Sequence, residues 1–201
     1  AQVAANSISA AITGLLPSTT YYWQVYAVTE GDLSAALTGT QATLPAGTVT
    51  SIITGNWNTT TTWDCTCVPT AGDNVVIANG TTVTLNVNGA CNSLTVGQGV
   101  SGQLTIGNNA TARTLTVSTD VSVLAGATMI TGVTAATHLM TIGGNITNSG
   151  TLNLAPIATR VMNITFNKNG NQTISGAGAT TNFNRITLNM GTSNANVLDI
   201  T

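Results

Sequence analysis

Charged residues are nearly absent from this chain of 201 residues. Four Lys and Arg residues stand against six Asp and Glu residues, so charged side chains make up 5% of the sequence. Ordinary soluble domains carry roughly 25%. The formal net charge of −2 provides no basic surface for nucleic acid or for anionic lipid. We therefore expect neither nucleic-acid binding nor membrane insertion.

Long apolar runs and helix-forming residues are also scarce. No stretch approaches the roughly 18–20 apolar residues of a membrane-spanning helix, and no signal peptide is visible at Ala1. Thr and Val, which favour strands, and Asn and Gly, which serve turns, dominate instead. Because the apolar fraction of 42% is sufficient for a core, the composition predicts an all-β protein with almost no helix.

A short phrase recurs about every ten to twelve residues from residue 74 onward. It consists of an apolar residue, Thr or Asn, a second apolar residue, and then usually a turn residue. The copies lie at 83–85, 94–96, 104–106, 115–117, 152–154, 164–166 and 186–188. Residues two apart point to the same side of a strand, so each phrase buries its outer pair and exposes its middle residue. One such strand cannot bury its pair alone, whereas a stack of repeats can.

The spacing predicts a right-handed parallel β-helix, also called a β-solenoid, with the antiparallel hairpins of a β-sandwich as the alternative. We expect strands at 74–78, 82–87, 93–97, 103–107, 114–118, 121–124, 139–142, 145–147, 151–154, 162–166, 172–175, 185–189 and 197–200. The section 126–137 is expected to be irregular. Asn-rich turns separate the strands, and we expect Asn side chains to bond from one turn to the next rather than to hold calcium.

The first 45 residues differ from the rest and hold all three tyrosines. Residues 15–21 match the pattern L-x-P-x-T-x-Y, and residues 21–28 alternate like a strand. This region resembles the last strands of a fibronectin type III domain, whose tyrosine corner would be Tyr21. The resemblance implies that residues 1–45 are the C-terminal part of a β-sandwich and that the chain is a fragment.

A boundary follows at Pro45 and Gly47, because Pro and Gly end strands. Residues 46–73 are predicted to form a linker and the solenoid's N-terminal cap, and residues 74–201 the solenoid itself. We assign Trp57 and Trp63 to the cap, since the first turn of a solenoid must be closed against water by bulky apolar groups. The alternative is that an exposed ring stacks on a sugar.

The three cysteines, Cys65, Cys67 and Cys91, are candidates for a structural disulfide. Their odd number leaves at least one thiol unpaired within the chain. A bond between Cys65 and Cys67 would be strained because only one residue separates them, whereas either could reach Cys91 if the turns stack. Free buried thiols are the alternative. A zinc site is disfavoured because the only histidine, His138, is distant in sequence.

The segment from Trp57 to the end resembles a module of giant secreted surface proteins of Bacteroidetes. The similarity lies in the motif Trp-Asp-Cys-Thr-Cys-Val-Pro-Thr-Ala-Gly-Asp at 63–73 and in shorter motifs at 82–85, 92–96, 144–152 and 170–176. That group includes gliding-motility adhesins and other cargo of type IX secretion. The resemblance implies export, exposure at the cell surface, and adhesion or filament building, with no catalytic motif to transfer.

Candidate catalytic chemistry is sparse. β-helix enzymes that act on carbohydrates need clustered carboxylates, but the six here are scattered. The closest pair in the second region, Asp64 and Asp73, is better explained by turn formation. His138 is expected to point outward or into a polar corner, without a catalytic role. No cofactor or metal is expected.

A column of outward Thr residues is the remaining surface feature. Its members are Thr84, Thr95, Thr105, Thr116, Thr165 and Thr187. Regular Thr arrays on flat solenoids can bind ice, although Thr also suits any exposed strand position. The sequence thus predicts a non-catalytic stalk or display segment of an extracellular adhesin or filament protein, whose partners are neighbouring domains. Glycan binding, a carbohydrate-active β-helix enzyme and, last, ice binding are the alternatives.

Overall fold

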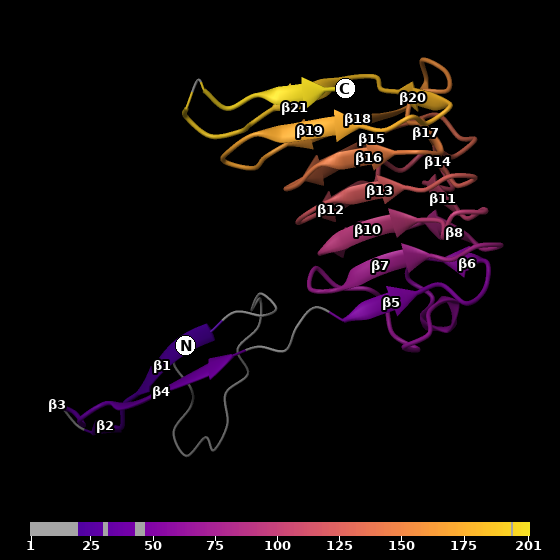
Figure 1. Cartoon of the computed structure of the whole chain (residues 1–201). Coiled ribbons are helices and arrows are strands. Elements are labelled where there is room, and N and C mark those ends of the chain that lie inside the picture. Colours follow the sequence, from indigo (N-terminus) through magenta and orange to yellow (C-terminus); the bar gives the residue numbers. More distant parts are fainter. Residues whose placement is uncertain (1–19, 30–31, 43–46, 194) are drawn as a thin grey trace. The chain divides into compact units, whose positions relative to one another are not determined.

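The computed structural model describes residues 20–29, 32–42, 47–193 and 195–201 (Figure 1). It divides the chain into two compact units, Ala1–Ala46 and Gly47–Thr201. The division lies next to the boundary expected at residue 45. The two units are described separately below.

The N-terminal unit contains two antiparallel strand pairs. Strand β1 (Thr20–Val25) pairs with β4 (Leu37–Ala42), and β2 (Val28–Thr29) pairs with β3 (Asp32–Leu33). Most of the segment that resembles a tyrosine corner lies outside the described residues. Its one candidate residue, Tyr21, is opposite Gln41 in the β1–β4 pair. Antiparallel pairing is therefore established for this unit, and the fibronectin-like sandwich stays a prediction.

The second unit is a parallel β-solenoid of about six turns, built from three sheets (Figure 1). Sheet 1 contains β5 (Thr48–Thr50), β7 (Asn74–Ile77), β10 (Ser93–Val96), β13 (Val121–Val123), β16 (Ile146–Asn148), β19 (Gln172–Ser175) and β22 (Leu198–Ile200). Sheet 2 contains β6 (Gly55–Asn56), β8 (Thr82–Leu85), β11 (Gln103–Ile106), β14 (Thr128–Thr131), β17 (Thr151–Asn153) and β20 (Thr180–Asn182). Sheet 3 contains β9 (Gly89–Cys91), β12 (Thr114–Val117), β15 (Ala136–Ile142), β18 (Arg160–Phe166) and β21 (Ile186–Leu188).

Each complete turn contributes one strand to every sheet, as β7, β8 and β9 do in the first complete turn. Strands of successive turns pair in parallel, so the predicted β-solenoid is confirmed and the antiparallel sandwich is wrong. One turn takes between 19 residues, from Val75 to Leu94, and 29 residues, from Thr151 to Thr180. The repeat of ten to twelve residues read from the sequence therefore reports single strands rather than whole turns.

Columns of inward aliphatic residues form the core. In sheet 1, one column runs through Val49, Val75, Leu94, Val121, Ile146 and Ile174, all of them buried. Burying such a side chain stabilises the fold by about 1.5–3 kcal/mol, and every turn adds several. This contribution lets the stack hold together with very few charged groups.

Asparagine side chains join successive turns, as expected from the sequence, and they do so from strands as well as from the connections between strands. Five pairs in the described part of the chain donate amide to amide from turn to turn. They are Asn58–Asn86, Asn74–Asn92, Asn153–Asn182, Asn163–Asn184 and Asn169–Asn196, with N···O distances between 2.7 and 3.2 Å. In each of these pairs, an Asn side-chain amide in one turn has a hydrogen-bond partner in the neighbouring turn, without any charged group.

The outward Thr residues do not form the single column expected from the sequence. Thr95 lies in sheet 1, Thr84 and Thr105 lie in sheet 2, and the other three lie in sheet 3. The longest series lies in sheet 3, where Thr116, Thr141, Thr165 and Thr187 follow one another, and sheet 2 carries the shorter series Thr128, Thr151 and Thr180. Three strands per turn distribute the copies of the phrase over three faces.

Candidate functional site

At the N-terminal end of the solenoid, the segment between β5 and β7 brings tryptophan, cysteine and aspartate side chains together. This segment folds back on β5 and contains a single helical turn, η1 (Thr60–Thr62). Trp63 forms an antiparallel bridge with Ser51, the Ile52 amide donates to the Thr62 carbonyl at 2.8 Å, and the Asp64 amide donates to the Thr50 carbonyl at 2.9 Å. The outer edge of β5 is thereby paired, and the end of the sheet is closed.

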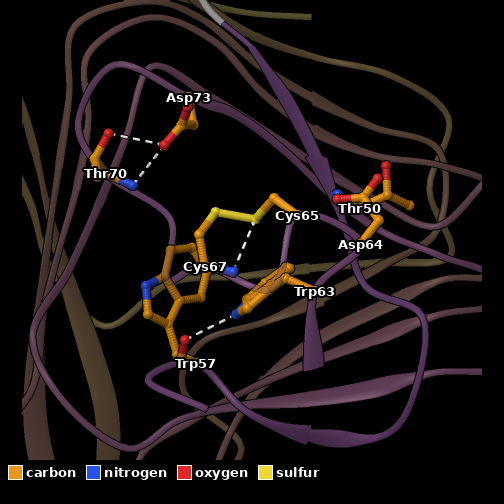
Figure 2. Close-up of a disulfide and its surroundings, with 8 residues drawn as sticks. All are labelled: Thr50, Trp57, Trp63, Asp64, Cys65, Cys67, Thr70 and Asp73. Atoms are coloured by element: carbon orange, nitrogen blue, oxygen red, sulfur yellow. Dashed lines mark hydrogen bonds between the residues drawn. A yellow bond between two sulfur atoms is a disulfide. The ribbon is translucent and has the colours of Figure 1, made fainter. Parts of the chain in front are cut away.

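Two tryptophans of this segment point into the core of the solenoid (Figure 2). Trp57 and Trp63 are 1% and 0% exposed, and their rings meet edge to face with centroids 5.4 Å apart. The Trp63 indole N–H donates to the Trp57 carbonyl at 2.9 Å, so the buried donor is satisfied. Their predicted role in closing the first turn agrees with this burial. Neither ring is available to stack on a sugar.

The disulfide joins the two cysteines that were expected not to pair. Cys65 and Cys67 are bonded, with their Cα atoms 5.1 Å apart, and Cys91 is a free, buried thiol. The expected pairing with Cys91 is therefore wrong. Cys91 lies on β9 and faces the core, where burial, assisted by the Asp73 carboxylate, raises its pKa to about 12. Thr66, between the bonded cysteines, accommodates the tight ring with a φ of +53°.

The two carboxylates of this segment cap backbone groups (Figure 2). Asp64 accepts the Thr50 amide at 3.0 Å. Asp73 accepts both the amide and the hydroxyl of Thr70, each at 2.8 Å. In the close-up the disulfide lies between these two caps, next to the tryptophans. The carboxylates thus accept hydrogen bonds within turns and caps, as the turn-forming interpretation predicted.

No cluster with the composition of a metal site occurs among the described residues, where no group of three or more His, Cys, Asp or Glu side chains comes together. The described helices include none that is long and apolar enough to cross a membrane. Comparison with protein-family models, curated proteins and solved structures finds no match for this chain. The functional argument therefore depends on the geometry and on the sequence features described above.

His138 occupies the interior, contrary to the outward position expected for it. It is 1% exposed and shares the inward face of β15 with Met140 and Ile142. Its ring lies against Gly107, where an added Cβ would be 2.5 Å from the His138 Cε1 atom. The Arg113 amide donates to His138 Nδ1 at 3.0 Å, which fits a neutral ring protonated on Nε2. Burial, together with the nearby Arg113 guanidinium, lowers the pKa of His138 below 6.5.

This depressed pKa predicts that acid destabilises the solenoid. Between pH 6.5 and the lower folded-state pKa, the unfolded chain binds a proton at His138 that the folded chain does not. The stability is therefore complete above about pH 6.5 and falls as the pH is lowered toward the folded-state pKa. Urea unfolding followed at pH 8 and at pH 5.5 should show this loss. The His138→Gln variant should lose most of the difference, and an unchanged difference would contradict the assignment.

Exposed aromatic rings belong to the N-terminal unit. Tyr22 is 82% exposed and Tyr26 is 43% exposed, whereas Phe166 of the solenoid is fully buried. Gln24 lies between the two tyrosines and accepts a hydrogen bond from the Tyr26 hydroxyl at 2.9 Å. Because alternate residues of a strand share a face, Tyr22 and Gln24 point to the same side of β1. The chain's polar aromatic surface therefore lies outside the solenoid.

Proposed function

We propose that this chain is a non-catalytic structural segment of a large cell-surface protein. Its solenoid acts as a stalk that spaces or displays neighbouring domains of the same protein. The observation that carries the proposal is the use made of the polar side chains. Asp64, Asp73 and Asp120 accept backbone amides, at 2.7–3.0 Å, and the Asn side chains join one turn to the next. These side chains therefore hydrogen-bond to the backbone or to each other and stabilise the stacked turns. They do not converge on a common point, as catalytic groups would.

The resemblance to secreted surface proteins of Bacteroidetes supports the same proposal. One of the segments that carry this resemblance, residues 63–73, contains Trp63 and the Cys65–Cys67 disulfide. Disulfides persist in oxidising compartments, so the Cys65–Cys67 bond favours an extracellular location. We propose export by type IX secretion and a part in adhesion or gliding, with surface glycans or further copies of the protein as additional partners.

The stalk function predicts a stable protein with no turnover. Circular dichroism should place the thermal midpoint of the solenoid above the roughly 45–65 °C of ordinary mesophilic domains. A panel of polysaccharides should yield no products with the wild type or with the Asp64→Asn/Asp73→Asn double variant. If the wild type cleaves a polysaccharide and the double variant does not, the protein is a carbohydrate-active enzyme and the stalk proposal is wrong. Unfolding on mild heating would also count against it.

Glycan binding is the second candidate, and the exposed tyrosines of the N-terminal unit favour it. Tyrosine rings flanking an amide side chain suit a sugar, whose apolar face stacks on the rings and whose hydroxyls bond to the amide. A glycan array probed with the wild type and with the Tyr22→Ala/Tyr26→Ala double variant tests this candidate. Binding that requires the tyrosines supports it, and an empty array for the wild type removes it.

A further inference from the structure

The Cys65–Cys67 disulfide contributes little as a cross-link. It closes a ring around a single intervening residue, Thr66, and so constrains the unfolded chain far less than a bond between distant residues would. The segment is already held by other contacts, since Asp64 and Trp63 pair with β5 on one side and Asp73 caps Thr70 on the other. The fold therefore has little need of this bond for stability.

Formation of the ring also holds Thr66 in an unfavourable conformation. Thr66 is the one non-glycine residue with positive φ among those the structure describes, and its φ is +53°. A β-branched residue is a rare occupant of this left-handed region, because its side chain crowds the backbone there. Opening the ring lets Thr66 return to an ordinary conformation, so its relaxation favours the reduced form.

The bond is open to attack from solvent. Cys65 and Thr66 are exposed, and Cys67 is half-buried with one side against the core. The Cys67 amide donates to Cys65 Sγ at 3.2 Å, so a thiolate that departs at Cys65 already has a hydrogen-bond donor. The other thiol, Cys91, is fully buried and faces away from solvent. It therefore does not compete for external reagents.

We propose that the Cys65–Cys67 disulfide is a thiol-exchange site for external thiols and that the cap stays folded when it opens. A thiolate attacks Cys67 Sγ, the S–S bond breaks, and Cys65 leaves as a thiolate that takes up a proton. A second thiolate then attacks the external sulfur of the mixed disulfide, which releases an oxidised disulfide and leaves Cys67 reduced. The site gains two electrons and two protons, and two external thiols are oxidised. Small thiols and exposed cysteines of other proteins are the substrate class.

The test is a redox titration of the native protein in buffers of reduced and oxidised dithiothreitol, with alkylation and mass measurement of the free thiols. We expect Cys65 and Cys67 to be alkylated in weakly reducing buffers, while Cys91 stays unmodified. The amides of Ile52 and Asp64, which pair with neighbouring backbone, should keep their protection against hydrogen exchange. Resistance of the bond until the chain is unfolded, or loss of that protection on reduction, would overturn the proposal.

Substitutions at Thr66 separate the contribution of its conformation from that of simple exposure. Asn tolerates positive φ much better than Thr, so Thr66→Asn should stabilise the oxidised form. The ratio of reduced to oxidised dithiothreitol at which half of the disulfide is open should then rise about three- to tenfold. Thr66→Val keeps the β-branch and removes only the hydroxyl, so its midpoint should match the wild type. Equal midpoints for the Asn variant and the wild type would overturn the role assigned to Thr66.

Discussion

Replacement of Trp63 by Ala should destabilise the solenoid by about 3–5 kcal/mol, which is the usual cost of removing a buried tryptophan. The ring is completely buried, packs edge to face against Trp57, and donates its indole N–H to the Trp57 carbonyl. Its loss leaves a cavity under the cap and a buried carbonyl without its donor. Urea unfolding followed by circular dichroism measures the change, because fluorescence would be altered by the substitution itself.

Two control variants make the Trp63 prediction specific. Trp63→Phe keeps most of the apolar bulk and removes the hydrogen bond, so it should cost less than the Ala variant. Trp23→Ala makes the same change in the N-terminal unit, where the ring is 37% exposed, and should leave the unfolding of the solenoid unchanged. Equal stability of Trp63→Ala and the wild type would mean that the cap does not close the first turn.

Most strands could be predicted because one physical rule, alternation, governs them. Strands such as β8, β11 and β12 show the burial pattern in which every second residue is inward, as the phrase requires. The rule missed β9, whose residues are Gly89, Ala90 and Cys91, because these small residues give no apolar signal. Gly89 has no room for a side chain, since a Cβ there would lie 2.7 Å from the Leu85 Cδ1 atom and 3.1 Å from the Trp57 ring.

Strand β14 was missed for a different reason. Its inward residues are Met129 and Thr131, while its outward position holds the apolar Ile130, so hydrophobicity no longer marks the buried face. Thr131 is nevertheless only 2% exposed and donates its hydroxyl to the Arg160 carbonyl. A polar residue satisfied by the neighbouring turn can occupy the interior, and this partner cannot be read from the local sequence.

The same reasoning explains the outcome at the candidate site. The inward direction of His138 was available in the sequence, because alternation places it on the face of Met140 and Ile142. Its burial differs from the expectation because a polar side chain can be buried once the backbone of another turn supplies a hydrogen bond, here the Arg113 amide. The disulfide pairing was beyond sequence reasoning. It depends on the inward direction of Cys91, which is set by the folded turns, and on the left-handed backbone that Thr66 adopts within the ring.

A matched pair of glycine substitutions tests the stacking of the turns directly. Gly126 and Gly80 have nearly the same backbone conformation, with φ of +74° and +76°. A Cβ on Gly126 would lie 2.1 Å from the Val100 carbonyl oxygen of the preceding turn, whereas a Cβ on Gly80 would have nothing within 4 Å. Alanine at Gly80 should therefore cost only the left-handed conformation, about 1–2 kcal/mol.

Alanine at Gly126 should cost this amount and a further 1–3 kcal/mol or so, since backbone of two adjacent turns must separate to admit the methyl group. The difference between the two variants in urea unfolding isolates the close contact between turns from the cost of positive φ. A larger loss for Gly126→Ala is the result that closely stacked turns require. Equal losses would mean that the turns at Val100 and Gly126 are not held in contact, and the stalk proposal would lose its rigid coil.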